Sequence, residues 1–146
     1  MKTVTLEEFK TFNPCWMKTE EGTARLEKIG SRKKEWTALD VLRLEEVSAE
    51  DRLWAVLREE FVPAHILHEF VCRCAEGALR KAGVTDDRSW NAIRVKRLWI
   101  EGKATDTELA AARDAARDAA LAAARDAAWD AARSEHVKML IALLEE

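Results

Sequence analysis

Residues 109–132 read LAAARDAARDAALAAARDAAWDAA, which is one 12-residue unit written twice with a single change, Arg117 to Trp129. Alanine has the highest helix propensity of all residues, and aspartates stand three residues before arginines, a spacing at which an ion pair adds about 0.2–0.5 kcal/mol. The segment 105–145 is therefore predicted to be helical. It forms either one long helix or two helices with a break near Ser134, which could cap the final one.

The repeat does not present one common face. Twelve residues turn an α-helix by about 1200°, so Leu109 and Leu121 lie about 120° apart. A stripe of uncharged positions nevertheless continues at spacings of three and four residues, and its small side chains allow another helix to approach closely. The stripe consists of Leu109, Ala112, Ala116, Ala120, Ala123, Ala127 and Ala131. It serves either the protein's own core or a homodimer formed through this helix.

Helix start and stop signals recur along the chain. Three segments fit the capping box, in which a threonine caps a helix and an acid three residues later bonds back to it. They are Thr5 with Glu8, Thr37 with Asp40, and Thr105 with Glu108. The remaining signals are N-caps at Ser48 and Thr85, a first-turn proline at Pro63, and glycines that end helices at Gly83 and Gly102.

These signals predict an all-α protein, because the alternation of apolar and polar residues that is typical of strands is absent. We expect helices over 5–12, 22–29, 38–45, 48–60, 63–82, 86–101 and 105–145. The length of 146 residues fits one domain, a compact helical bundle with a long alanine-rich C-terminal helix. Its parts are the N-terminal helices of 1–60, a central helical pair over 61–104, and the long helix over 105–146. The segment 30–36 is the best candidate for a flexible connection.

Charge and cysteine content narrow the class of protein. The net charge of −3 argues against a generally basic nucleic-acid binder, although residues 61–104 carry eight basic and five acidic groups. The three cysteines, without a signal peptide ahead of them, indicate a reduced thiol state and a cytoplasmic protein. No run approaches the roughly 20 apolar residues of a membrane span, so a membrane partner is not expected.

The helix expected over 63–82 separates into an apolar arc, which includes Cys74, and a polar arc. The polar arc holds the weak candidates for a zinc site, which are His65, His68, Cys72 and Glu76. Zinc ligands usually come from at least two elements, and a solvated or structural histidine face explains this arc more simply. We therefore expect neither a metal nor another cofactor.

Catalytic motifs are missing from the sequence. There is no GxSxG, HExxH, Walker or GxGxxG pattern. A nucleophile pair of Cys72 and His68 could form across one helical turn, but no residue is found that would orient the histidine or bind an oxyanion. The sequence therefore favours a protein that is not an enzyme.

The helix expected over 86–101 carries the clearest candidate for a binding site. Trp90, Arg94 and Arg97 cluster on the side opposite its apolar arc, and tryptophan and arginine dominate the energetics of protein interfaces. The alternative is structural: Trp90 packs as a first-turn staple, and the arginines bridge to acids, namely Asp86, Asp87 or Glu76.

Other tryptophans allow the same two interpretations. Trp54 and Trp99 have the spacing of helical core residues, so burial is expected for both. Trp129 stands in an otherwise alanine surface, where its ring would add contact area for the core or for a partner. Together with the acidic residues of the repeat it completes the predicted partner-binding set, which adds Asp118, Asp126 and Asp130.

Residues 61–133 resemble small helical proteins of bacterial genomes and prophages that are labelled immunity proteins of polymorphic toxin systems. The shared pattern is an F-x-C-x-C-A-E helix, a D-x-R-S/P helix start, and a W-x-x-G-x-x-T/S-x-x-E-L turn before an alanine-rich helix. In this sequence it comprises Phe70, Cys72, Cys74, Ala75 and Glu76, then Asp86, Asp87, Arg88 and Ser89, then Trp99, Gly102, Thr105, Glu108 and Leu109. The resemblance implies a stoichiometric inhibitor that binds and neutralises a toxin.

A phage-encoded inhibitor of a host defence nuclease, such as an anti-CRISPR protein, is a close rival, because it uses the same kind of helical blocking surface. Two other classes stay open. One is a nucleic-acid-binding regulator that uses Arg88, Arg94, Lys96 and Arg97. The other is a self-assembling protein whose alanine stripes pair.

Overall fold

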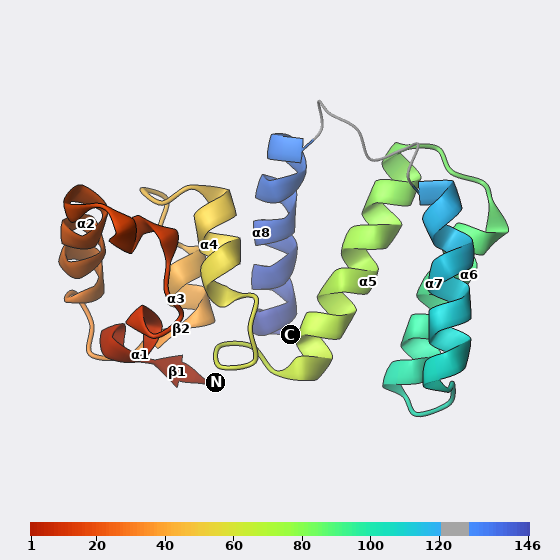
Figure 1. Ribbon diagram of the computed structural model, residues 1–146, viewed down its shortest axis with the longest axis horizontal. Coiled ribbons are helices and arrows are strands. Elements are labelled where there is room, and N and C mark those ends of the chain that lie inside the picture. Colours follow the sequence, from red (N-terminus) through yellow and green to blue (C-terminus); the bar gives the residue numbers. More distant parts are fainter. Residues whose placement is uncertain (121–128) are drawn as a thin grey trace. The chain divides into compact units, whose positions relative to one another are not determined.

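The computed structural model describes residues 1–120 and 129–146, apart from the side chains of residues 118–120 and 129–131. Over this part the chain is all-α, as predicted, with one minimal two-stranded sheet (Figure 1). It divides into two compact units, Met1–Ala64 with Glu145 and His65–Leu144 with Glu146, called here the N-terminal and C-terminal units. The single-domain assignment stays a prediction. None of the helices described combines the length and apolarity that a membrane span requires.

The N-terminal unit is built from short elements whose starts were visible in the sequence. Thr5 and Thr37 form complete capping boxes, and the Ser48 hydroxyl accepts a hydrogen bond from the Asp51 N–H at 3.1 Å. The elements in order are β1 (Thr3–Val4), α1 (Leu6–Lys10), the 3-10 helix η1 (Cys15–Lys18), α2 (Glu20–Gly30), β2 (Trp36–Thr37), α3 (Ala38–Leu42) and α4 (Ala49–Val56).

The sheet was not predicted from the sequence. Thr3 pairs with Thr37 and Val4 with Trp36 in an antiparallel ladder, and two-residue strands are too short to show an alternating pattern. The segment 30–36, expected to be a flexible connection, is instead tied at both ends. Trp36 is buried, and its indole N–H donates to the Gly30 carbonyl at 3.0 Å.

The C-terminal unit contains α5 (Ala64–Lys81), α6 (Asp87–Ile100), α7 (Asp106–Ala120) and α8 (Trp129–Glu145). Gly83 and Gly102 have positive φ and end α5 and α6 as predicted, each followed by a residue whose N–H bonds back into the last turn. Thr105 and Glu108 form the expected reciprocal cap of α7. The N-cap of α6 is Asp86 rather than Thr85, because the Asp86 carboxylate accepts from the Arg88 N–H at 2.9 Å.

The alanine-rich segment packs partly as predicted. α7 lies alongside α6, with Leu109 and Ala112 buried and Ala116 half-buried (Figure 1). The remaining members of the stripe lie outside the described residues or have side chains that do. α8 runs through Ser134 without interruption, so the alternative with a break near Ser134 is wrong.

The polar and apolar arcs predicted for α5 are wrong at several positions. Cys72, placed on the polar arc, is only 2% exposed, whereas Val71 is 56% exposed and Cys74 is half-buried. The physical reason is that α5 packs on two sides. Its Phe70 ring contacts His136 of α8, and Cys72 belongs to a core cluster with Ile93 of α6.

Close helix contacts in the N-terminal unit yield a stability prediction. A Cβ at Gly30 would lie 2.5 Å from the Leu6 side chain, so Gly30→Ala is expected to lower the free energy of unfolding by about 1–3 kcal/mol. Gly77→Ala is the matched control: its Cβ would meet nothing within 4 Å, and a better helix former should raise stability by about 0.5–1 kcal/mol. Urea unfolding followed by circular dichroism measures both. Equal stability of the two variants would contradict the contact at Leu6.

Candidate functional site

Trp90, the predicted anchor of a partner-binding site, has intramolecular contacts. Its indole N–H donates to the Val84 carbonyl at 2.8 Å, and its half-buried ring packs against the core cluster of Cys72, Leu79 and Ile93. These contacts are the ones expected if Trp90 packs within the protein instead of binding a partner. They fix the loop before α6 onto the helix.

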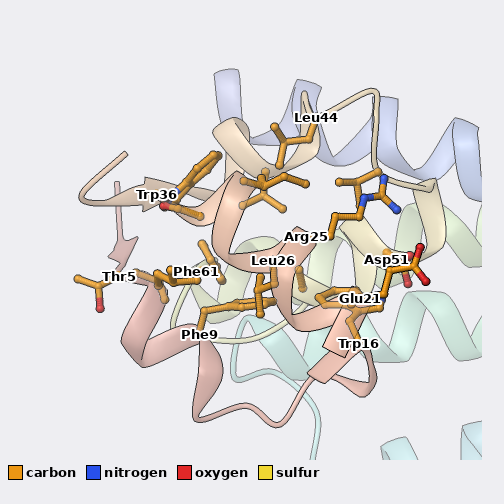
Figure 2. A pocket seen from close by; sticks show the side chains of 18 of the residues that line it. Thr5, Phe9, Trp16, Glu21, Arg25, Leu26, Trp36, Leu44, Asp51 and Phe61 are labelled. Atoms are coloured by element: carbon orange, nitrogen blue, oxygen red, sulfur yellow. Dashed lines mark hydrogen bonds between the residues drawn. The ribbon is translucent and has the colours of Figure 1, made fainter. Parts of the chain in front are cut away.

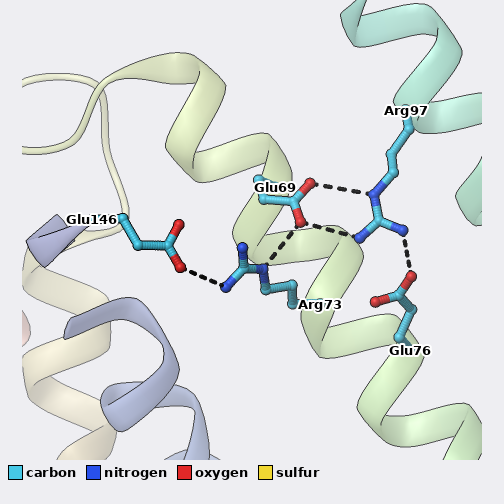
Figure 3. Close-up of polar contacts among 5 residues, drawn as sticks. All are labelled: Glu69, Arg73, Glu76, Arg97 and Glu146. Carbon is cyan, nitrogen blue, oxygen red and sulfur yellow. Dashed lines mark hydrogen bonds and ion pairs between the residues drawn. The ribbon is translucent and has the colours of Figure 1, made fainter. Parts of the chain in front are cut away.

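The two arginines of the predicted site differ in their surroundings. Arg94 is exposed and pairs with Asp87 at 2.9 Å. Arg97 is half-buried and donates to both oxygens of Glu69, at 3.1 and 3.3 Å, and to Glu76 (Figure 3). The structure therefore brings Arg97 together with α5. The bridges to Asp87 and Glu76 are among those that the structural alternative anticipates.

Figure 3 shows that this network extends beyond α6. Arg73 donates to Glu69 at 3.0 Å and to the terminal residue Glu146 at 3.4 Å. The hydrogen bonds that Arg97 donates to Glu69 lower the pKa of that carboxyl, and the hydrogen bonds that Arg97 donates to Glu76 and Glu69 raise the pKa of Arg97. Glu69 and Arg97 therefore stay charged at neutral pH, and the network joins the helices that carry these residues.

The candidate metal ligands do not converge. His65 is exposed, the His68 ring meets the Trp99 ring edge-on at 5.4 Å, and Glu76 is bound to Arg97. Burial raises the pKa of the Cys72 thiol, which leaves it protonated and a poor nucleophile or ligand. Within the part of the chain that is described, no three groups of suitable type are placed to hold a metal ion.

The basic residues proposed for nucleic-acid binding are largely engaged. Arg88 pairs with Asp86 at 2.6 Å, and the Arg94 and Arg97 pairs are given above. Lys96 is buried, with its ammonium 4.0 Å from the centre of the Trp99 ring, and burial lowers its pKa. Such a surface offers little free positive charge to phosphates.

The predicted partner-binding residues of the repeat lie outside the described residues, in whole or in their side chains. Asp126 lies outside the described residues, and so do the side chains of Asp118, Trp129 and Asp130. Their partner-binding role stays a prediction.

Trp54, expected to be buried, is 40% exposed and belongs to a group that the sequence did not reveal. Its ring packs against Trp16 at 5.4 Å and Phe9 at 6.2 Å between ring centres. The Arg58 guanidinium lies 4.3 Å from the Phe12 ring centre and 4.6 Å from that of Trp54. We call these five residues the aromatic surface.

The aromatic surface adjoins an apolar cavity of about 350 Å³ within the N-terminal unit (Figure 2). Phe9 and Trp16 line both features. The other apolar walls come from α2, β2, α3 and the segments around α4, including Leu26, Ile29, Trp36, Leu44 and Phe61. Figure 2 also shows Glu21, Arg25 and Asp51 together at one end of the cavity.

One sequence signal could have indicated this region. Four of the ten aromatic residues, Phe9, Phe12, Trp16 and Trp36, fall within residues 9–36, a segment of mostly polar short helices. Aromatic side chains bury a large area each, so such a stretch favours packing of these rings against one another or against the core. The sequence does not show that Trp54 joins them.

No protein family, no curated protein and no solved structure matches this chain. The resemblance to immunity proteins therefore stays a prediction.

The network in Figure 3 gives a second prediction. Arg97→Ala is expected to lower the free energy of unfolding by about 1–3 kcal/mol near neutral pH, because half-buried Glu76 would lose its cation and Glu69 would keep only Arg73. The matched control is Arg94→Ala, whose exposed pair should be worth less than about 0.5 kcal/mol. Urea unfolding of both variants measures the difference.

The effect of Arg97→Ala should depend on pH. Arg97 holds the pKa of Glu69 below its ordinary value of 4.5, so this stabilisation is fully present above that value and is lost as pH falls through the lowered pKa. The stability gap between native protein and variant should shrink on going from about pH 6 to about pH 3. A gap that does not change with pH would show that packing of the arginine stem, rather than its charge, carries the effect.

Proposed function

We propose that this protein works by binding another protein, and that the aromatic surface is the contact site. The observation that carries the proposal is the 40% exposure of Trp54 beside the stacked guanidinium of Arg58. Tryptophan and arginine are the residues most enriched in interface hot spots, where each contributes a large contact area. Met17 and Leu57, both exposed apolar residues, lie next in sequence to members of this surface.

The surface is well ordered before any partner arrives. Arg58 donates to the Trp54 carbonyl at 2.9 Å while its guanidinium covers the Phe12 and Trp54 rings. Its Nε is buried without a hydrogen-bond partner, and burial lowers the pKa of the side chain. Because these contacts already hold the arginine and the rings in place, little side-chain entropy would be lost on binding.

A non-catalytic role agrees with the chemistry of the described side chains. Cys72 is a buried thiol with a raised pKa, and burial raises the pKa of Cys74 to about 11. Neither is suited to nucleophilic attack at neutral pH. The finer proposal, suggested by the sequence resemblance, is an inhibitor that neutralises a toxin or a host defence nuclease.

The test begins with capture of partners by the tagged protein from host cells, with nuclease treatment of one sample and identification by mass spectrometry. The affinity of a nuclease-resistant partner is then measured for three variants. Trp54→Ala with Arg58→Ala removes the aromatic surface, Trp90→Ala with Arg94→Ala removes the site predicted on α6, and Leu98→Ala removes an exposed apolar side chain elsewhere.

We expect the first variant to lose at least about tenfold in affinity, the loss typical of a hot spot, and the Leu98 variant to bind like the native protein. Circular dichroism checks that each variant keeps its helices. A loss confined to the Trp90 and Arg94 variant would move the site to α6. Recovery of nucleic acid alone would argue for the regulator instead.

A further inference from the structure

The cavity of the N-terminal unit has the size and lining of a small-molecule site. Protein interiors contain few voids larger than a water molecule, and ligand sites typically span about 300–1,000 Å³. At about 350 Å³ this cavity falls in the second range, although it lies in a unit of only about 64 residues. Its walls are mainly aromatic and aliphatic, as ligand pockets usually are.

The walls are held in place by close contacts, so the cavity is preformed. Trp36 is fixed by its hydrogen bond to the Gly30 carbonyl, and Phe9 and Trp16 stack with their ring centres 5.9 Å apart. α2 approaches its neighbours at two glycines: a Cβ at Gly22 would overlap the Trp16 carbonyl oxygen at 2.1 Å, and one at Gly30 would overlap Leu6. These contacts keep α2 from moving inward to fill the space.

One end of the cavity is acidic. Glu21 and Asp51 line it, one from α2 and one from α4, and Figure 2 shows them near Trp16 and Arg25. Arg25 donates a hydrogen bond to the backbone carbonyl of Glu46. The pKa of the Glu46 carboxyl is lowered mainly by its hydrogen bond from Arg32 and also by the charge of Arg25. The two cavity carboxylates therefore outnumber the cation beside them.

We propose that this cavity binds a small apolar molecule that carries one positive charge, such as an arylalkyl amine. The apolar body would replace water against Phe9, Leu26 and Trp36, and the ammonium would lie between Glu21 and Asp51. The Trp16 ring, which Figure 2 shows at the same end, would add a cation–π attraction if the ammonium lay over its open face. This inference does not depend on the proposed protein partner.

The test is isothermal titration of the full chain with three molecules of one shape: 4-phenylbutylamine, 4-phenylbutan-1-ol and 4-phenylbutanoate. We expect the amine to bind about three to ten times more tightly than the alcohol, since each exposed ion pair contributes modestly, and the acid to bind most weakly. Equal affinities of amine and acid would overturn the proposal.

Two variants with the same change of net charge locate the site. Glu21→Gln with Asp51→Asn should remove most of the preference for the amine over the alcohol. Glu20→Gln with Glu50→Gln changes acids that stand one residue away and do not line the cavity, so the preference should stay. Equal effects of the two pairs would mean that the amine binds through the general negative charge of the protein, and would refute the site.

A third variant tests whether the apolar body enters the cavity. Leu26→Trp adds ring volume where Leu26 lines the wall, and should weaken all three molecules at least about tenfold while leaving their order unchanged. Circular dichroism shows whether the variant is still folded. An unchanged order of the three affinities shows that the cavity has been partly filled and not lost through unfolding. Undiminished affinity for the alcohol in this folded variant would place the ligand outside the cavity.

Discussion

Arg97 ties α6 to α5 through Glu69 and Glu76, and much of the C-terminal unit depends on that tie. It turns the side of α6 that looks most polar in the sequence toward another helix instead of toward water. Lys96, the residue before Arg97, is also buried, and its ammonium lies 4.0 Å from the centre of the Trp99 ring. The unit therefore buries ionisable groups on two sides of one helix.

That arrangement is tolerable because each charge has a partner of the right kind. Burying a charged group costs several kcal/mol unless hydrogen bonds or opposite charges replace water. Glu69 receives donors from both Arg97 and Arg73, whereas the Lys96 ammonium has the electron-rich face of Trp99. Ala112 of α7 is buried where α7 packs on α6, and its small side chain allows the two helices to approach closely.

Local signals in the sequence were enough to place most helices. Capping boxes at Thr5, Thr37 and Thr105 and the glycines after α5 and α6 act within one or two turns, so neighbouring residues alone determine them. The burial of Cys72 and the exposure of Trp54 could not be obtained this way. Both depend on which faces of a helix are covered by segments far away in the sequence, and α5 is covered on two faces.

The candidate site was likewise predictable from the sequence only in part. Bridges from the α6 arginines to nearby acids were anticipated as one of two alternatives, since the acids are common and the helical spacing is regular. The aromatic surface and the cavity were not, because they gather side chains from short helices that carry no long periodic pattern. The pairing of β1 with β2 joins segments that are far apart in the sequence, but strands of two residues are too short to be recognised from an alternating pattern.

Phe9 and Trp16 belong to both the aromatic surface and the cavity wall, so the two features share physical parts. Trp16 packs against Trp54 and also lines the cavity. A ligand that shifts the Trp16 ring would therefore alter the surface offered to a protein partner. By thermodynamic linkage, a partner that fixes Trp54 against Trp16 would change the affinity of the cavity by the same factor. The contacts among the Phe9, Trp16 and Trp54 rings would then be the element that couples the two features.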